Sequence, residues 1–128
     1  MPNHIAPAAL LIAALVAGPA VARAANACPA GDLQLDAVIR AVEAAPTCAT
    51  AFKVAEACAF GSTGDVQTTA IVIQKCESRM TTSQRIAYER AAKACHARHA
   101  GKDGSMYRAM AAFCAAEAAV KAAGNAGR

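Results

Sequence analysis

Large side chains are scarce in this sequence of 128 residues, which has no tryptophan, two tyrosines and three phenylalanines. Proteins that bind single-stranded nucleic acids stack the bases on aromatic rings, so this shortage argues against a nucleic-acid partner. Alanine is frequent instead, and small side chains bury little apolar area per residue. The fold therefore needs a source of stability beyond its hydrophobic core.

Runs of β-branched residues are nearly absent, so no strand pattern competes with helices. Glycine and proline occur at few places after residue 24 and divide this part into five helical stretches. The expected boundaries are an N-cap at Asp32, breaks at Pro46 and Gly61–Gly64, a cap at Thr81–Ser83 and a turn at Gly101–Gly104. The sequence predicts an all-α fold, a small disulfide-stapled bundle of about five helices.

Helical spacing also predicts which residues point inward. For the third helix the expected inward face includes Val66, Thr69, Ala70, Ile73 and Cys76. For the fourth it is Ala87, Ala91, Ala94 and Cys95, and for the fifth it is Met106, Met110, Phe113, Cys114 and Glu117.

The beginning of the chain predicts a leader. The segment Ile5–Val16 is almost continuously apolar, and Ala22 and Ala24 supply the small residues that precede a cleavage point, although Met1–His4 lacks a basic residue. This pattern is typical of a secretory signal peptide. We expect a signal peptide over residues 1–24, a disulfide-bonded helical domain over 25–123 and a frayed tail over 124–128.

Two other interpretations of the leader stay open. An uncleaved membrane anchor is one, although Pro7 and Gly18-Pro19 shorten the apolar run that it requires. Acylation at Cys28, as in a lipoprotein, is the other, although the hydrophobic segment ends early for such a site.

Six cysteines follow the leader, namely Cys28, Cys48, Cys58, Cys76, Cys95 and Cys114. No C-x-x-C pair occurs, whereas zinc sites usually take ligands that are close in sequence. An even number of cysteines in a short exported chain instead predicts three disulfides and a secreted or periplasmic location. Each bridge adds about 2–4 kcal/mol to stability.

The spacing of the cysteines restricts how they pair. On one straight helix the Cα atoms of Cys48 and Cys58 are about 15 Å apart, too far for a disulfide. Facing residues of an antiparallel helical hairpin are mirror images about its loop. This reflection favours Cys48–Cys76 and Cys28–Cys58, which leaves Cys95–Cys114, while other pairings of six cysteines stay open.

No nucleophile, base and orienting acid are suggested together, so we expect neither an enzyme nor a cofactor. His96 and His99 are three residues apart and could bind a metal, with Met106 and Met110 as soft partners for copper. Exposed polar residues on a basic helix explain the histidines more simply, so the main prediction has no metal site. A small periplasmic protein that binds copper or zinc, or protects against stress, is the alternative function.

Charge is uneven along the chain. Residues 26–60 carry a net charge of −2, whereas residues 61–128 carry +5. A solvated helix face would explain the basic part. A docking surface for an acidic partner is the more specific interpretation, with candidate residues Arg85, Tyr88, Arg90 and Lys93.

Short motifs in the second half resemble a known family. Gln84-Arg85 leads to Cys95, and Gly104-Ser105 leads to Cys114. Together with the segment from Cys48 to Cys58, they are similar to the LprI-like family of small exported lysozyme-inhibitor-type proteins. The resemblance covers residues 48–119, but the family's usual tryptophan is replaced by Ala87 and its usual arginine by Ala91.

The resemblance implies a non-enzymatic secreted or periplasmic binding protein whose partner at the cell envelope is a lysozyme-type hydrolase. It also implies a bridge between Cys48 and Cys58, in conflict with the pairing that reflection favours. No direct membrane contact is expected other than through an uncleaved leader.

Overall fold

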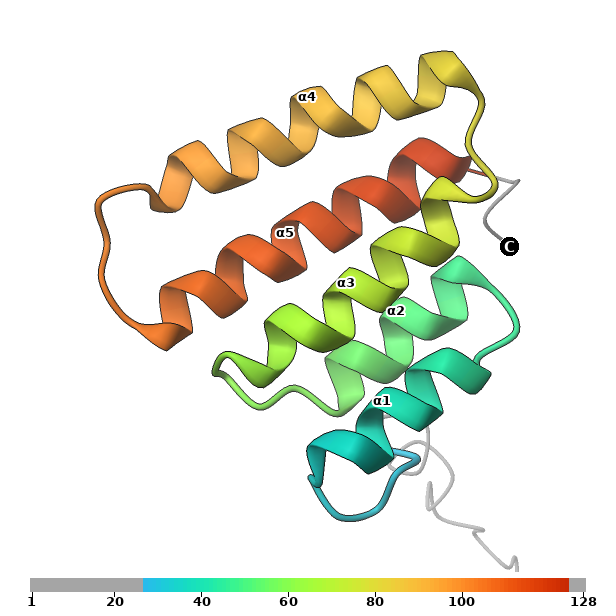
Figure 1. Cartoon of the computed structure of the whole chain (residues 1–128), viewed down its shortest axis with the longest axis vertical. Coiled ribbons are helices and arrows are strands. Elements are labelled where there is room, and N and C mark those ends of the chain that lie inside the picture. Colours follow the sequence, from blue (N-terminus) through green and yellow to red (C-terminus); the bar gives the residue numbers. More distant parts are fainter. Residues whose placement is uncertain (1–26, 125–128) are drawn as a thin grey trace, which may run out of the picture.

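A computed structural model describes residues 27–124, and within this range it contains five α-helices and no strand (Figure 1). The helices are α1 (Leu35–Ala44), α2 (Cys48–Ala57), α3 (Gly64–Glu77), α4 (Thr82–His99) and α5 (Ser105–Ala123). The predicted all-α bundle is confirmed. The predicted signal peptide and residues 125–128 of the predicted tail lie outside the described residues. None of the described helices is both long and apolar enough to cross a membrane.

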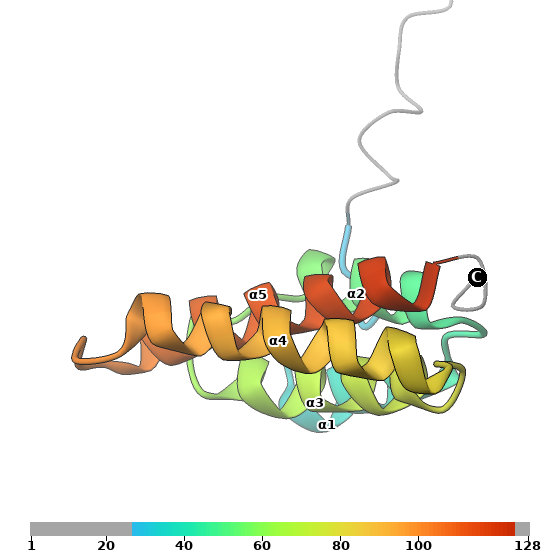
Figure 2. The same ribbon diagram turned by 90° about the horizontal axis from the view of Figure 1, so that it is seen from above.

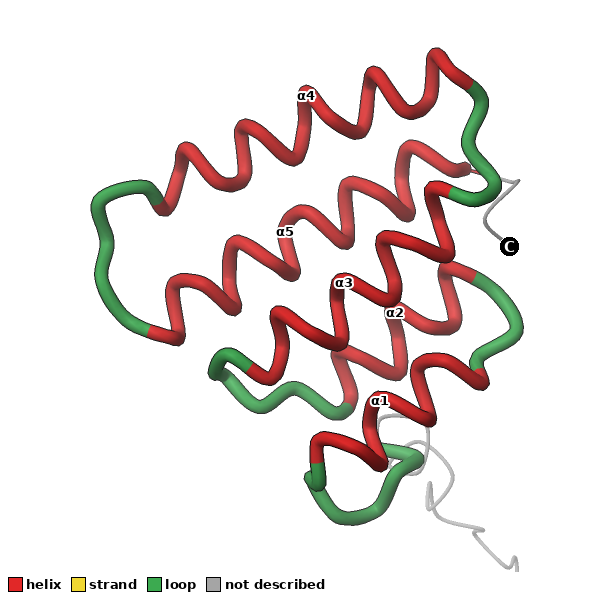
Figure 3. The backbone as a smooth tube through the Cα atoms, viewed as in Figure 1, coloured by secondary structure: helices red, strands yellow, loops and turns green. Residues whose placement is uncertain are grey.

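Helix α5 lies between α4 on one side and α3 on the other, and α2 contacts both α3 and α5. Helix α1 packs against α2 and α3, so α4 and α1 form opposite edges of the molecule (Figures 1 and 2). Short loops join successive helices (Figure 3). Because α4 packs mainly against α5, most of its surface stays exposed.

The core consists of small side chains. Val38, Val42 and Val72 are fully buried and pack with buried cysteines and with alanines of α2 and α5. Packed against this core, the half-buried rings of Phe52 and Phe113 meet edge to face with centroids 6.3 Å apart. These two rings join α2 to α5 outside the fully buried core.

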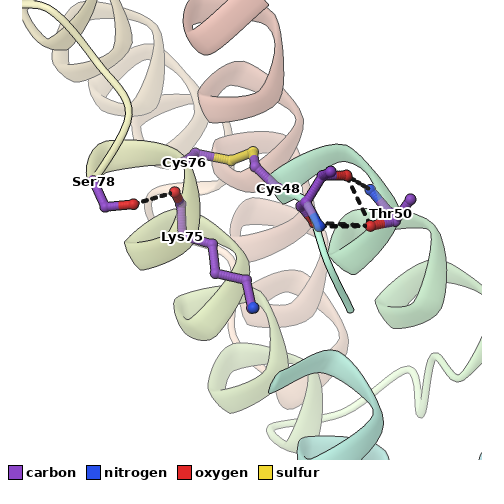
Figure 4. Close-up of a disulfide and its surroundings, with 6 residues drawn as sticks. Cys48, Thr50, Lys75, Cys76 and Ser78 are labelled. Atoms are coloured by element: carbon purple, nitrogen blue, oxygen red, sulfur yellow. Dashed lines mark hydrogen bonds between the residues drawn. A yellow bond between two sulfur atoms is a disulfide. The ribbon is translucent and has the colours of Figure 1, made fainter. Parts of the chain in front are cut away.

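Three disulfides join the helices, and their Cα–Cα distances are 4.8 Å for Cys28–Cys58, 5.0 Å for Cys48–Cys76 and 5.7 Å for Cys95–Cys114. The first two are the pairs that reflection favours, and the third is the pair that they leave. The Cys48–Cys58 bridge implied by the family resemblance is wrong, because α2 is one continuous helix from Cys48 onward. Figure 4 shows Cys76 of α3 bonded to Cys48 at the start of α2. Three disulfides are typical of proteins from an oxidising environment.

The caps of the helices agree with the sequence in part. Thr47 and Thr81 each form a reciprocal capping box, with Thr50 and Gln84 respectively. The sequence suggested Asp32 as the N-cap of α1, but Asp32 does not cap this helix. Its carbonyl instead accepts a hydrogen bond of 2.8 Å from the amide of Gln34, which is the actual N-cap, so the helix begins later.

The predicted inward faces of α4 and α5 are correct for Cys95, which is buried, and in part for Phe113 and Cys114, which are half-buried, but wrong for the other residues. Helix α4 buries Ala92 and Cys95, whereas Ala87, Ala91 and Ala94 are exposed, because a helix with one main neighbour covers only a narrow stripe. Helix α5 buries seven alanines, Ala109, Ala111, Ala112, Ala115, Ala116, Ala119 and Ala123. Helix α3 buries Thr69 and Cys76 as predicted, whereas Val66 is 41% exposed and Ala70 is exposed.

Candidate functional site

A groove of about 670 Å³ lies between α2 and the first half of α5. We call it the α2–α5 groove and define it by Phe52, Glu56, His99, Met106, Met110 and Phe113, which line it together with flanking residues. Phenylalanine and methionine side chains make most of its surface apolar, and carboxylates lie among them. Concave, mostly apolar sites with a few polar groups are typical of ligand-binding pockets.

One face of α5 forms a wall of this groove. Met106, Met110 and Phe113 follow the spacing of neighbours on a helix, and all three line the groove. Met106 is 54% exposed and Met110 48% exposed. The sequence therefore identified a genuine apolar face of α5, but this face borders the groove, whereas the alanine face packs into the core.

The structure separates the two histidines that the sequence grouped. His99, the last residue of α4, lines the α2–α5 groove, as do Met106 and Met110, while the exposed His96 is not among the lining residues. The imidazole ring of His99 lies 6.5 Å from the ring of Tyr107. Its Nδ1 atom is buried and has no hydrogen-bond partner among residues 27–124.

A second groove of about 550 Å³ runs between α4 and α5. Its walls include Ala87, Ala91 and Ala94, the three alanines that the sequence assigned to the core. Arg98 lines both this groove and the α2–α5 groove, as do Cys114 and Glu117. No group of three or more His, Cys, Asp or Glu side chains in the described part of the chain is placed to hold a metal ion.

Of the four candidate partner-binding residues, Arg85 and Tyr88 are engaged within the molecule. Arg85 donates a hydrogen bond of 3.1 Å to the carbonyl of Glu77, and its Nη1 lies 3.9 Å from the Glu77 carboxylate. Tyr88 packs against the core, and burial raises the pKa of its phenol, with a further contribution from the charges of Glu77 and Glu89.

Arg90 and Lys93 differ from these two. Both are exposed on α4, three residues apart and thus neighbours on one face of the helix. The ion pairs within residues 27–124 are Arg85–Glu77 and Lys121–Glu117, so neither Arg90 nor Lys93 is neutralised by a described carboxylate.

The uneven charge along the sequence corresponds to an uneven distribution of charge over the folded molecule. The hairpin of α4 and α5, residues 82–123, contains seven basic and three acidic residues, a net charge of +4. Residues 27–81 contain four basic and six acidic residues, a net charge of −2. Helices α4 and α1 lie at opposite edges of the molecule (Figure 1). The excess of basic residues is therefore on the side of the molecule that α4 and α5 form.

Sequence reasoning missed the part of the groove that α2 supplies. Phe52 and Glu56 are far from α5 in sequence, and only the packing of α2 against α5 brings them to Phe113. The one signal of the groove in the sequence was the helical spacing of Met106 and Met110. Comparison of the chain with family models, with curated proteins and with solved structures finds no match.

Proposed function

We propose that this chain is a non-enzymatic, secreted or periplasmic binding protein that docks through α4 onto an acidic surface of a protein partner at the cell envelope. The observation that carries the proposal is the exposure of Arg90 and Lys93, without ion pairs to described residues, on an edge helix. The leader pattern and the three disulfides support export.

Electrostatics favours such docking. A net charge of +4 on the α4–α5 hairpin attracts an acidic partner at long range, and cations without local partners stay available for contact. The Cys95–Cys114 bridge fixes α4 on α5, so the two cations are presented on a rigid element. Rigidity reduces the entropy that is lost when the partner binds.

The resemblance to LprI-like proteins favours a lysozyme-type hydrolase as the partner. Glycoside hydrolases of this kind have a pair of carboxyl groups in the catalytic cleft, and these match a lysine or arginine side chain. After cleavage behind Ala24 the protein carries a net charge of +3, which repels a basic lysozyme at long range. Inhibition would therefore depend on local insertion of Arg90 or Lys93 into the cleft.

The test is inhibition of several lysozyme types by the purified, oxidised protein. We expect R90E/K93E to weaken inhibition by about tenfold or more, because it reverses the charges at the contact. The matched control is R40E/K53E, which changes the same number of exposed charges on α1 and α2. Absence of inhibition of every lysozyme type, or equal effects of the two variants, would refute the proposal.

A further inference from the structure

We propose that His99, Met106 and Met110 form a binding site for a soft monovalent metal ion of the Cu(I) class. The site goes beyond docking through α4, because it lies in the α2–α5 groove and uses none of the exposed cations of α4. It also differs from the pair of histidines that the sequence suggested.

The two methionines supply the donors that select the ion. They are one helical turn apart on α5, which places their Cβ atoms about 5–6 Å apart. Both line the groove and are about half exposed, and the methionine side chain is flexible enough for two sulfur atoms to meet at one ion. Thioether ligands favour Cu(I) over hard cations such as Mg²⁺ or Ca²⁺.

His99 supplies a nitrogen donor from the other helix. It lies at the end of α4, directly before the turn that leads into α5, and lines the same groove as the methionines. Its Nδ1 has no hydrogen-bond partner among the described residues, so no such bond fixes the orientation of the ring. Rotation of the ring can therefore present a nitrogen to an ion held by the two sulfur atoms, and imidazole is a common copper ligand.

Two further features suit a cation at this place. The Cys95–Cys114 bridge joins α4 to α5 one helical turn before His99, which limits how far the histidine moves relative to the methionines. The charged side chains that line the groove are three carboxylates, Glu56, Asp65 and Glu117, and one guanidinium, Arg98. Glu117 is paired with Lys121 and the Asp65 carboxylate is bonded to three backbone amides, so Glu56 is the lining carboxylate that stays available to a bound cation.

The experiment uses Ag(I), a redox-inert probe with the same preference for thioethers, added to the oxidised protein labelled with ¹³C at the methionine methyl groups. We expect saturation at one ion per chain and shifts of the Met106 and Met110 methyl signals. The Met80 signal should stay unchanged, because Met80 packs against the core outside the groove. Shifts of Met80 equal to those of the other two would overturn the proposal.

Variants separate the donors. M106L/M110L conserves volume, so we expect the helical spectrum to persist while Ag(I) affinity falls by about tenfold or more. H99N should weaken binding as well, and the matched control H96N should not. Unchanged affinity in M106L/M110L, or an H96N effect as large as that of H99N, would refute the site.

Discussion

Asp65 shows how one residue shapes the molecule. Among residues 27–124 it is the only buried charged side chain, with 1% of its surface exposed. Its carboxylate accepts hydrogen bonds from the amides of Phe60, Gly61 and Ser62 at 2.8, 2.7 and 3.2 Å. It thereby holds the loop between α2 and α3 at the margin of the α2–α5 groove. Buried charge is tolerated here because hydrogen bonds replace its hydration.

Replacing this carboxylate is expected to destabilise the fold. Asp65→Ala leaves three backbone amides without their acceptor, and an unsatisfied buried polar group costs about 1–3 kcal/mol. Urea unfolding followed by circular dichroism measures the change. The matched variant Asp103→Ala, at an exposed position in the turn before α5, should change stability by about 0.5 kcal/mol or less. Equal effects of the two variants would contradict the role of Asp65.

Tyr88 gives a prediction of pH dependence. Burial raises the pKa of its phenol above the ordinary value of 10.0, and the charges of Glu77 and Glu89 raise it further. The folded state therefore holds the proton more tightly than the unfolded state. The resulting stability is complete below pH 10.0 and is lost as the pH rises from 10.0 through the raised pKa.

The Y107F variant leaves Tyr88 as the only tyrosine and allows this titration to be followed by the absorbance of the phenolate. We expect a midpoint above 10.0 in the folded protein and about 10 in concentrated urea. Adding E89Q should lower the folded midpoint, since it removes one of the repelling charges. A folded midpoint equal to the unfolded one would contradict the prediction.

At the scale of elements, α4 depends on a single neighbour. Its buried residues, Ala92 and Cys95, form a narrow stripe against α5, and the outer surface is polar or alanine apart from Ile86, which is 53% exposed. Such a stripe buries little apolar area. The Cys95–Cys114 bridge is consequently the main covalent restraint that keeps α4 in place.

Removal of this bridge should loosen α4 first. The closed segment has a sequence separation of 19, for which the chain-entropy estimate is about 3 kcal/mol. In Cys95→Ala/Cys114→Ala we expect amide hydrogen exchange to accelerate in α4 more than in α3. In the comparison variant Cys48→Ala/Cys76→Ala the acceleration should appear in α2 and α3. If hydrogen exchange accelerated equally in all helices of both variants, the conclusion that each bridge stabilises mainly the helices it joins would be contradicted.

At the scale of the whole molecule, the three bridges compensate for a core of valine and alanine. They connect the segment before α1 to the end of α2, α2 to α3, and α4 to α5. Each is estimated to contribute about 3–4 kcal/mol, while the net stability of a small domain is about 5–15 kcal/mol. The combined contribution is therefore comparable to the total.

Reduction of all three disulfides is expected to unfold the protein at room temperature. Circular dichroism at 222 nm in the presence of dithiothreitol should lose most of its helical signal, and reoxidation should restore it. The untreated, oxidised protein at the same temperature is the control. Retention of the full signal after complete reduction would show that the alanine and valine core is sufficient.

Much of the fold could be predicted from local signals. Helix breakers and the cap at Thr81–Ser83 located the helices, because these signals are local. The mirror symmetry of hairpins indicated two of the bridges and left the third, because each hairpin turns about one loop. The groove could not be predicted in the same way. Its walls include Phe52 of α2 and Phe113 of α5. These residues are far apart in the sequence, and no local signal indicates that they are in contact.

The sequence by itself determined an all-helical chain in which Cys48 and Cys58 cannot bond to each other on one straight helix, because helix rise per residue sets the distance between them. Tertiary structure decided which faces of α4 and α5 meet solvent. Helical periodicity indicates which face of a helix is apolar, but it does not indicate which other helix, if any, covers that face. The number of helices around α4 and α5 left the alanines of α4 and the methionines of α5 exposed, and placed His99 in the same groove as Met106 and Met110.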